Sequence, residues 1–402
     1  MRFADNRNKI GKYIPAVVFL IFIYGMALWF IFSPKPDYSS SEKRYLQKFP
    51  EVTAEKLLSG DFGSEFETFF ADRFPQRNTW VGLNAYTALA VGNNGASGVY
   101  NCKNGYLINK PVSTENNLYK NIGAVADFAK SIDTPTTVML VPSTGYIVDD
   151  VLPTFHDKYN DDEDIRKISS TLSKDKIGFV DLRERFKSEY KNGSQLYYKT
   201  DHHWTTKGAY TGYQELCKAL GITPIDDSTL KKDSYPDFYG TTYSSSGFWL
   251  TPPDNIEIWN NPKNSDRNIS VKITEGANIK TSGSMYFTDH LKEDDKYPVF
   301  IDGNHALTEI TNTNAKNGTI LLIKDSFSHS LAPFLAENYS KVVLVDLRYY
   351  KESVSDLVTT YNPEQVVVLY GIDNLATDTD IVWLKYCLLY TSDAADDLTR
   401  VD

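Results

Sequence analysis

The chain has 402 residues, which is enough for a large hydrophobic core and for either two domains or one elaborated domain. Its formal net charge is -10 and its isoelectric point is near 5.2, so we expect neither nucleic acid nor an anionic membrane surface as a partner. Aromatic residues make up 13% of the chain. They fit either a tyrosine-rich core or surfaces that stack on sugar rings, and composition does not choose between the two.

An almost unbroken apolar run, residues 14–32, is long enough to cross the hydrocarbon core of a membrane. Basic residues gather just before it, at Arg2, Arg7, Lys9 and Lys12. Only Lys35 follows closely, and this asymmetry places the N-terminus in the cytoplasm. A cleaved signal peptide is the alternative, but the run is long for one and no small-x-small site precedes Ser33. We therefore expect a cytoplasmic tail at 1–12 and an uncleaved transmembrane anchor at 13–32.

The segment that follows, residues 33–60, is polar, contains Ser-Pro-Lys-Pro and is interpreted as a stalk. Phenylalanines at helical spacing then predict a helix that ends before Pro75, and a further helix is expected near Trp80. Residues 61–386 are expected to form one extracytoplasmic domain.

Helices and strands alternate through the middle of the chain. Apolar residues recur at three- and four-residue intervals between Leu118 and Ile132, which predicts an amphipathic helix. A β-branched strand follows at 136–142, then a helix at 161–173 and a buried strand at 177–182. This alternation is typical of a parallel sheet with crossover helices.

Another helix should begin at Thr205 or Thr206 and end at Gly221. Residues 226–315 change to a Ser-, Thr-, Asn- and Tyr-rich composition, which we interpret as a β-rich insertion or lid within the same domain. Three buried strands then follow, at 320–323, 342–345 and 366–369. Polar or glycine residues come directly after each of them, and open α/β sheets place their sites at these ends.

Several side chains that can take part in catalysis lie close together in the stretch from Lys199 to Gly208, just before the predicted helix. Asp201, His202, His203 and Trp204 are consecutive, in a chain that has only six histidines. Further along, an apolar strand stops abruptly at Asp325-Ser326, ahead of a helix. A serine at such a turn has an exposed hydroxyl, but it needs a base that is itself oriented by a carboxylate. The two stretches together therefore predict a Ser-His-Asp arrangement, although either alone is a weak signal.

A metal site is the competing use of the acid and the two histidines. Successive side chains of an extended chain point to different sides, so adjacent histidines rarely bind one ion together. His290, His305 and His329 show no ligand spacing either. We expect no metal and no cofactor, and His329 is interpreted as a structural residue of the helix after Ser326.

Thr200-Asp201-His202-His203-Trp204-Thr205, followed much later by Lys324-Asp325-Ser326-Phe327, resembles the DHHW proteins. These are related to the SGNH-like O-acetyltransferases of alginate biosynthesis, which carry Asp-x-His-Trp before a Gly-Asp-Ser-Phe turn. The segments at 72–75 and 105–107 fit the same group. The resemblance implies an α/β, SGNH-hydrolase-like three-layer sandwich with a parallel sheet.

By position, the resemblance implies that Asp201 is the orienting acid, His203 the general base and Ser326 the nucleophile. His202 falls at the variable position of the motif. Lys324 stands where those proteins have glycine, which is expected to reshape the turn around the serine.

Five further positions are candidates for the oxyanion or the substrate, and His202 of the motif is one of them. Gly371-Ile372-Asp373-Asn374 resembles the Gly-x-Asn-Asp block of the family with its last two residues reversed, so Gly371 and Asn374 are candidate oxyanion donors, with a plain turn as the alternative. Trp204 either shapes an acceptor site or braces its loop. Arg348 either holds a carboxylate-bearing substrate or forms an ion pair with Asp346.

The function that the resemblance implies is O-acetyl transfer to a cell-surface or secreted polysaccharide through an acyl-serine, with a multispanning membrane acyltransferase as the source of acetyl groups. Two alternatives stay open at this point. A serine triad serves equally in a carbohydrate acetyl esterase, and a protein that keeps the fold but lost activity would bind polysaccharide.

The last residues, 387–402, resemble the translation of a sequencing adapter, and we interpret them as a non-native tail. This would leave Cys102 and Cys217 as the genuine cysteines, which allows at most one disulfide. Cys217 is expected on a buried helix face, which argues against that disulfide.

Overall fold

The computed structural model describes residues 2–112, 117–264 and 267–384, so the predicted non-native tail lies outside the described residues. The chain divides into two compact units, residues 1–87 and 88–402. We expected a domain boundary at residues 60 and 61, and this division falls later in the chain.

The first unit is mainly helical. Its elements are α1 (Arg2–Phe32), β1 (Tyr38–Ser39), β2 (Arg44–Tyr45), α2 (Ala54–Ser59), α3 (Asp61–Asp72) and the greater part of α4 (Arg77–Ala90). Within α1, residues 13–32 form a stretch long and apolar enough to cross a membrane, and its side chains are largely exposed. One apolar N-terminal helix of this kind fits a single-pass anchor.

The predicted stalk is tied to the end of α3. The buried guanidinium of Arg73 donates to the backbone carbonyls of Lys35 and Pro36 at 2.7 and 2.6 Å. The Asp72 carboxylate accepts from both terminal nitrogens of Arg44, at 2.9 and 2.6 Å. The polar segment after the anchor is therefore folded against the end of α3. Arg73 binds its backbone carbonyls, and Asp72 binds its Arg44 side chain.

The second unit is built on an eight-stranded sheet in the order β11-β10-β12-β14-β13-β15-β6-β7. The five strands from β14 to β7 are parallel, and the three at the other edge are antiparallel. The strands are β6 (Thr136–Val141), β7 (Gly178–Asp181), β10 (Ile269–Glu275), β11 (Asn278–Ser282), β12 (Leu307–Asn312), β13 (Asn317–Lys324), β14 (Tyr339–Val345) and β15 (Gln365–Gly371). All five predicted strands are confirmed, and they are the parallel ones.

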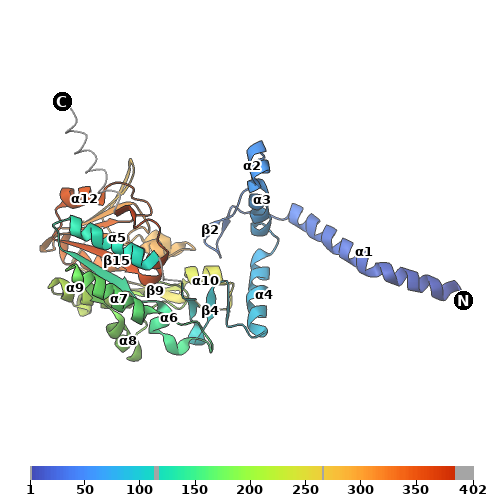
Figure 1. Cartoon of the computed structure of the whole chain (residues 1–402), viewed down its shortest axis with the longest axis horizontal. Helices are drawn as coiled ribbons and strands as arrows, with labels where there is room; N and C mark the ends of the chain where they lie inside the picture. The colour runs from blue at the N-terminus through green and yellow to red at the C-terminus, as the bar shows by residue number, and fades with distance from the viewer. Residues whose placement is uncertain (1, 113–116, 265–266, 385–402) are drawn as a thin grey trace. The chain divides into compact units, whose positions relative to one another are not determined.

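Helices cover both faces of this sheet, and Figure 1 shows α5 crossing in front of it. Alternate residues of each parallel strand enter two separate hydrophobic clusters, as the two-residue period of a strand requires. One cluster joins the sheet to α5 (Asn117–Ser131), α7 (Asp161–Lys174), α12 (Val354–Tyr361) and α13 (Ile372–Thr377). The other joins it to α6 (Thr144–Ile147), α8 (Arg183–Lys191), α9 (Thr206–Leu220) and α11 (Ser328–Leu335). The predicted three-layer α/β sandwich is therefore confirmed.

The predicted insertion, 226–315, is β-rich, but it does more than cover the domain. Its strands β10, β11 and β12 extend the central sheet, since β12 pairs antiparallel with β14. The remainder forms the hairpin of β8 (Lys231–Phe238) and β9 (Asp254–Asn260), with α10 (Thr241–Ser246) between them. Short 3-10 turns lie at Asp227–Thr229, Thr288–Lys292 and Tyr297–Val299.

Local sequence signals explain where α9 begins and ends. The Thr205 hydroxyl accepts from the Gly208 amide at 3.1 Å, and Gly221 ends the helix with φ of 69°. Before α5 lies a small three-stranded sheet of β3 (Gly95–Ala96), β4 (Val99–Asn101) and β5 (Leu107–Asn109). A 3-10 turn at Lys103–Gly105 lies between β4 and β5, and another at Asp149–Val151 follows α6. Cys102 and Cys217 are both buried, and both are free cysteines in this structure.

Candidate active site

The loop between α8 and α9 carries an acid and a histidine in direct contact. The Asp201 Oδ1 atom accepts from the backbone amide of His203 at 2.8 Å and lies 2.5 Å from its ring Nδ1. The Oδ2 atom accepts from the amide and the hydroxyl of Thr241, at 2.6 and 3.1 Å. Gly240 permits this approach, because a Cβ there would lie 2.1 Å from the Asp201 Cβ. The carboxylate is thus fixed by four donors and turned toward the imidazole.

Neighbouring imidazoles and hydrogen bonds keep this acid ionised despite its burial. Burial by itself raises the pKa of Asp201, but the neighbouring imidazoles and the hydrogen bonds from His203 outweigh it and hold the pKa well below its usual range. Because a carboxylate only accepts hydrogen bonds, Nδ1 of His203 carries its proton toward Asp201. The other ring nitrogen, Nε2, is then free to accept a proton.

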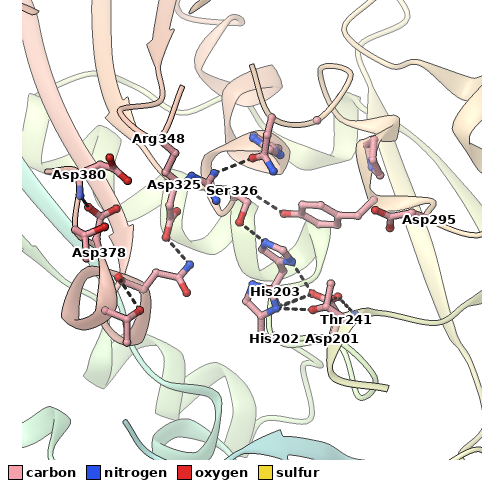
Figure 2. Close-up of a pocket in the computed structure, with 18 residues that line it drawn as sticks. Asp201, His202, His203, Thr241, Asp295, Asp325, Ser326, Arg348, Asp378 and Asp380 are labelled. Carbon is pink, nitrogen blue, oxygen red and sulfur yellow. Dashed lines mark hydrogen bonds and ion pairs between the residues drawn. The ribbon is translucent and has the colours of Figure 1, made fainter. Parts of the chain in front are cut away.

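Ser326 completes the arrangement, as Figure 2 shows. It follows β13, at the carboxyl end of a central parallel strand, and its Oγ lies 2.7 Å from Nε2 of His203. The structure therefore brings together all three predicted residues, although Ser326 is more than a hundred positions away from Asp201 and His203 in the chain. An imidazole in this position can take the serine proton and return it to a leaving group.

The hydrogen bonds of Asp325 stabilise the turn that carries Ser326. This buried carboxylate accepts from the amides of Phe327 and Gly371 at 2.9 and 2.8 Å, and from the side-chain amide of Asn374 at 2.8 Å. Burial raises the pKa of Asp325 against these hydrogen bonds. The prediction that Gly371 donates to an oxyanion is wrong for this structure, because its amide already binds Asp325. Asn374 lines the cleft and has a second amide hydrogen, so it stays a candidate donor.

Trp204 braces the loop, as one of its two interpretations expected. Its ring is fully buried, and Nε1 donates to the Phe327 carbonyl at 3.0 Å and to the Ser330 hydroxyl at 2.9 Å. The histidine loop and the serine turn are thereby joined. The alternative, that Trp204 shapes an acceptor site, is wrong because the ring has no exposed surface.

Lys324 does not disturb the serine turn. Its buried ammonium donates to Asp346 at 2.9 Å and lies 2.8 Å from Nε2 of His329, on the far side of the strand end. Burial lowers the pKa of Lys324 and holds that of His329 well below its usual range, so the imidazole is neutral and accepts from the lysine. The interpretation of His329 as a structural residue is confirmed by its burial and this contact. The expectation that Lys324 reshapes the turn is wrong, because its side chain bonds away from Ser326.

Arg348 forms the ion pair that the sequence offered as one interpretation. Its Nε and Nη2 donate to Asp346 at 2.8 and 2.6 Å, and Nη2 also donates to the Asn304 side chain at 2.9 Å. Burial raises the pKa of Asp346, but Arg348 and Lys324 outweigh burial and lower it. The guanidinium lines the cleft and shares the Asp346 carboxylate with Lys324.

His202 lies beside the reactive pair and gives a correction to the argument about metals. Its ring centroid is 3.9 Å from that of His203, so the two adjacent side chains do not point to different sides as expected. With Asp201 they offer three ligand atoms within 4.8 Å of one another. Each of these side chains is engaged elsewhere, since Nδ1 of His202 lies 2.7 Å from the Thr241 hydroxyl and His203 bridges Asp201 and Ser326. Burial lowers the pKa of His202 to about 4, which keeps it neutral.

Sequence reasoning missed residues of the insertion that complete the site. The Tyr297 ring stacks on His203 with centroids 4.0 Å apart, and its hydroxyl donates to the Ser326 carbonyl at 3.2 Å. Asp254 holds the start of the loop, because its carboxylate accepts from the amides of Lys199 and Thr200 at 3.0 and 2.8 Å. No local motif marks either residue, and only their contacts in the folded chain reveal them.

A second, small cavity of about 40 Å³ is lined by Ser143 and Asp373, and Ser143 joins Asp373 to a second buried acid, Asp161. Ser143, after β6, donates from its amide to Asp161 at 2.7 Å and from its hydroxyl to Asp373 at 3.0 Å. Burial raises the pKa of Asp161 to about 7, with a further rise from the charge of Asp373, and burial raises the pKa of Asp373 to about 6.

Both raised pKa values predict a stability that falls with rising pH. The folded protein holds protons that the unfolded chain, with carboxyl pKa values of about 4, has released. This contribution is complete below about pH 4 and is lost as the pH rises to about 7. We expect Asp161→Asn to stabilise the protein at pH 8 relative to wild type by about 2 kcal/mol, and by less at pH 5. Melting temperatures of both proteins at the two pH values test this. An asparagine variant less stable than wild type at pH 8 would contradict it.

Comparison with known proteins gives a consistent family and fold. Residues 106–345 match the family described as DHHW protein. No curated protein matches the chain. A solved DHHW family protein from Eubacterium siraeum is 18% identical, with a TM-score of 0.60, over 72% of this chain and 96% of that one. PatB1 of Bacillus cereus, solved with a sulfonyl adduct, is 20% identical, with a TM-score of 0.58, over 71% of this chain and 97% of that one.

The O-acetyltransferase domain of Pseudomonas putida AlgJ is a weaker match. It is 14% identical, with a TM-score of 0.46, over 72% of this chain and 99% of that domain. That likeness is too weak to support a conclusion about this chain. The two better matches show the predicted SGNH-like fold.

Proposed function

The chain belongs to the DHHW protein family, and from that membership and the geometry of the cleft we propose that it is a serine-dependent O-acetyltransferase of a polysaccharide. The observation that carries the proposal is the 2.7 Å contact between Ser326 Oγ and the Nε2 atom of His203, whose other nitrogen faces Asp201. This is the arrangement that makes a serine hydroxyl nucleophilic.

In the first step, Ser326 Oγ attacks the carbonyl carbon of an acetyl donor while His203 takes the hydroxyl proton. The tetrahedral intermediate carries a negative oxygen, and the second amide hydrogen of Asn374 is a candidate donor to it. The donor's leaving group departs with the proton from His203, which leaves an acetyl ester on Ser326.

In the second step, a sugar hydroxyl gives its proton to His203 and attacks the acetyl ester. Collapse of the intermediate returns the proton to Ser326 and releases the acetylated sugar. Asp201 stays ionised throughout and holds His203 in the tautomer that both steps need. Water in place of the sugar would give an acetyl esterase, and the same residues would act.

The alternative of a polysaccharide-binding protein without activity loses its main support. Two features motivate this alternative, the aromatic-rich surface and Lys324 in place of glycine, but the Lys324 side chain binds Asp346 and His329 instead of the serine turn.

The location that fits this function is outside the membrane, with α1 as a single-pass anchor and residues 1–12 in the cytoplasm. A membrane acyltransferase would supply acetyl groups from the inside. Protection of the second unit from protease added to intact cells would contradict the orientation. Normal acetylation in cells that lack any such acyltransferase would contradict the donor.

The experiment that tests the proposed function follows acetyl groups from p-nitrophenyl acetate in the presence of soluble oligosaccharides. Acetylated oligosaccharide, found by mass spectrometry, is the expected product. Release of acetate alone, at a rate that no oligosaccharide changes, would favour the esterase.

A further inference from the structure

The cleft that contains the triad is lined by an excess of carboxylates. It has a volume of about 450 Å³, which lies within the range of sites that enclose small ligands. Besides Asp201 and Asp325, which serve the triad and its turn, Asp295, Asp378 and Asp380 line it. Figure 2 shows Asp378 and Asp380 on one side of Ser326 and Asp295 on the other. An acceptor bound next to Ser326 would therefore have acidic side chains on two sides.

Asp378 and Asp380 each accept hydrogen bonds through only one of their two carboxylate oxygens. Oδ1 of Asp378 accepts from the amides of Asp380 and Ile381, both at 2.7 Å. Oδ1 of Asp380 accepts from the Lys351 ammonium at 2.6 Å. In the described part of the chain, the Oδ2 atom of neither residue accepts a hydrogen bond. The two side chains are thus fixed in orientation while each keeps an oxygen for a ligand.

The carboxylates that line the cleft outnumber its cations. Arg348 is the one arginine or lysine among the described residues that line it. Its guanidinium binds both oxygens of Asp346, and the same carboxylate also accepts from the buried Lys324. His202 and His329 are neutral, because burial lowers the pKa of both. A carboxylate or phosphate on the acceptor would meet net repulsion, because the aspartates of the cleft outnumber its one arginine.

This inference rests on the proposed function and names the class of its acceptor. We propose that the acceptor is a glycan unit without negative charge, whose hydroxyl or ammonium groups donate to the free oxygens of Asp378 and Asp380. Hydrogen bonds to ionised carboxylates are the stronger kind, and a hydroxyl-rich sugar supplies several donors. Polyuronates such as alginate, and phosphate-bearing glycans, are excluded by the same carboxylates.

Binding to a variant that cannot turn over separates this inference from the proposed function. The probes are matched trisaccharides of glucosamine, N-acetylglucosamine and galacturonic acid, which are cationic, neutral and anionic. Their affinities for full-length Ser326→Ala protein in detergent are measured by calorimetry. We expect the neutral and cationic sugars to bind at least about tenfold more tightly than the anionic one. Failure to form an acyl-serine would overturn the proposed function without altering this ratio.

Charge-removing substitutions identify the residues responsible. In the Ser326→Ala background, Asp378→Asn and Asp380→Asn each keep the oxygen that accepts the existing hydrogen bonds. Together they should reduce the preference for the neutral and cationic sugars over the anionic one by about tenfold. Asp289→Asn is the matched control, since it removes the same charge from an exposed side chain outside the cleft and should leave the ratio unchanged. Tighter binding of the galacturonic acid sugar, an unaltered ratio in the double variant, or no binding of any of the sugars would each overturn the proposal.

Discussion

Replacement of Ser326 by alanine is expected to reduce the hydrolysis of p-nitrophenyl acetate by at least about a thousandfold. The substitution removes the one oxygen that lies within 2.7 Å of Nε2 of His203, so no acyl-enzyme can form. Fold should be retained, because Ser326 is half-buried and its backbone contacts do not involve the hydroxyl. Steady-state rates and melting temperatures of the purified proteins measure the two effects separately.

Ser170→Ala is the matched control for this variant. Ser170 lies on the exposed face of α7, so the same chemical change there should leave the hydrolysis rate within about twofold of wild type. If Ser326→Ala kept a tenth or more of the wild-type rate, another nucleophile would have to carry the reaction, and the role given to the serine turn would be wrong.

Replacement of Asp201 by asparagine is expected to lower kcat by about a thousandfold or more while KM changes little. Four donors converge on the carboxylate, and an amide has only one oxygen to offer them. An amide nitrogen facing His203 would favour the tautomer with its proton on Nε2, which cannot accept the proton of Ser326. Because the pKa of Asp201 lies well below its usual range, wild type should keep this contribution at mildly acidic pH and lose it only as the pH falls through that depressed pKa.

The division of the effect between kcat and KM shows whether Asp201 orients His203 or only supports the loop. A loop that has lost its shape would raise KM and lower the melting temperature together. Equal kcat values for Asp201→Asn and wild type, in a protein of unchanged stability, would contradict the orienting role. Asp289→Asn again provides a control in which an exposed carboxylate is replaced.

The parallel part of the fold could be predicted because its sequence signals are local. β-Branched apolar runs such as 136–142 and 320–323 have one interpretation once helices alternate with them. The antiparallel edge could not be predicted in this way, since β10, β11 and β12 are short, mixed in composition and separated by turns. Their place in the central sheet depends on the pairing of β12 with β14, which is set by packing at long range.

The reactive residues could be predicted because they occur in unusual sequence patterns. The residues that position them could not be predicted. Asp201, His203 and Ser326 occur in dense or abrupt patterns that resemble a known family. Tyr297 and Asp254 lie in an insertion without recognisable motifs, and they act through contacts made only in the folded chain. Two expectations failed for the same physical reason: the Gly371 amide and the Lys324 ammonium each have a stronger partner in the buried acids of the strand ends.

The central claim is that Ser326 becomes acetylated, and intact-protein mass spectrometry tests it most directly. Full-length protein in detergent is mixed with p-nitrophenyl acetate, quenched in acid within the first turnover and weighed beside Ser326→Ala treated in the same way. We predict an added mass of about 42 Da, one acetyl group, in wild type only, with the modified peptide containing Ser326. An unmodified wild type that nevertheless hydrolyses the ester, or an equal adduct in the alanine variant, would contradict the account.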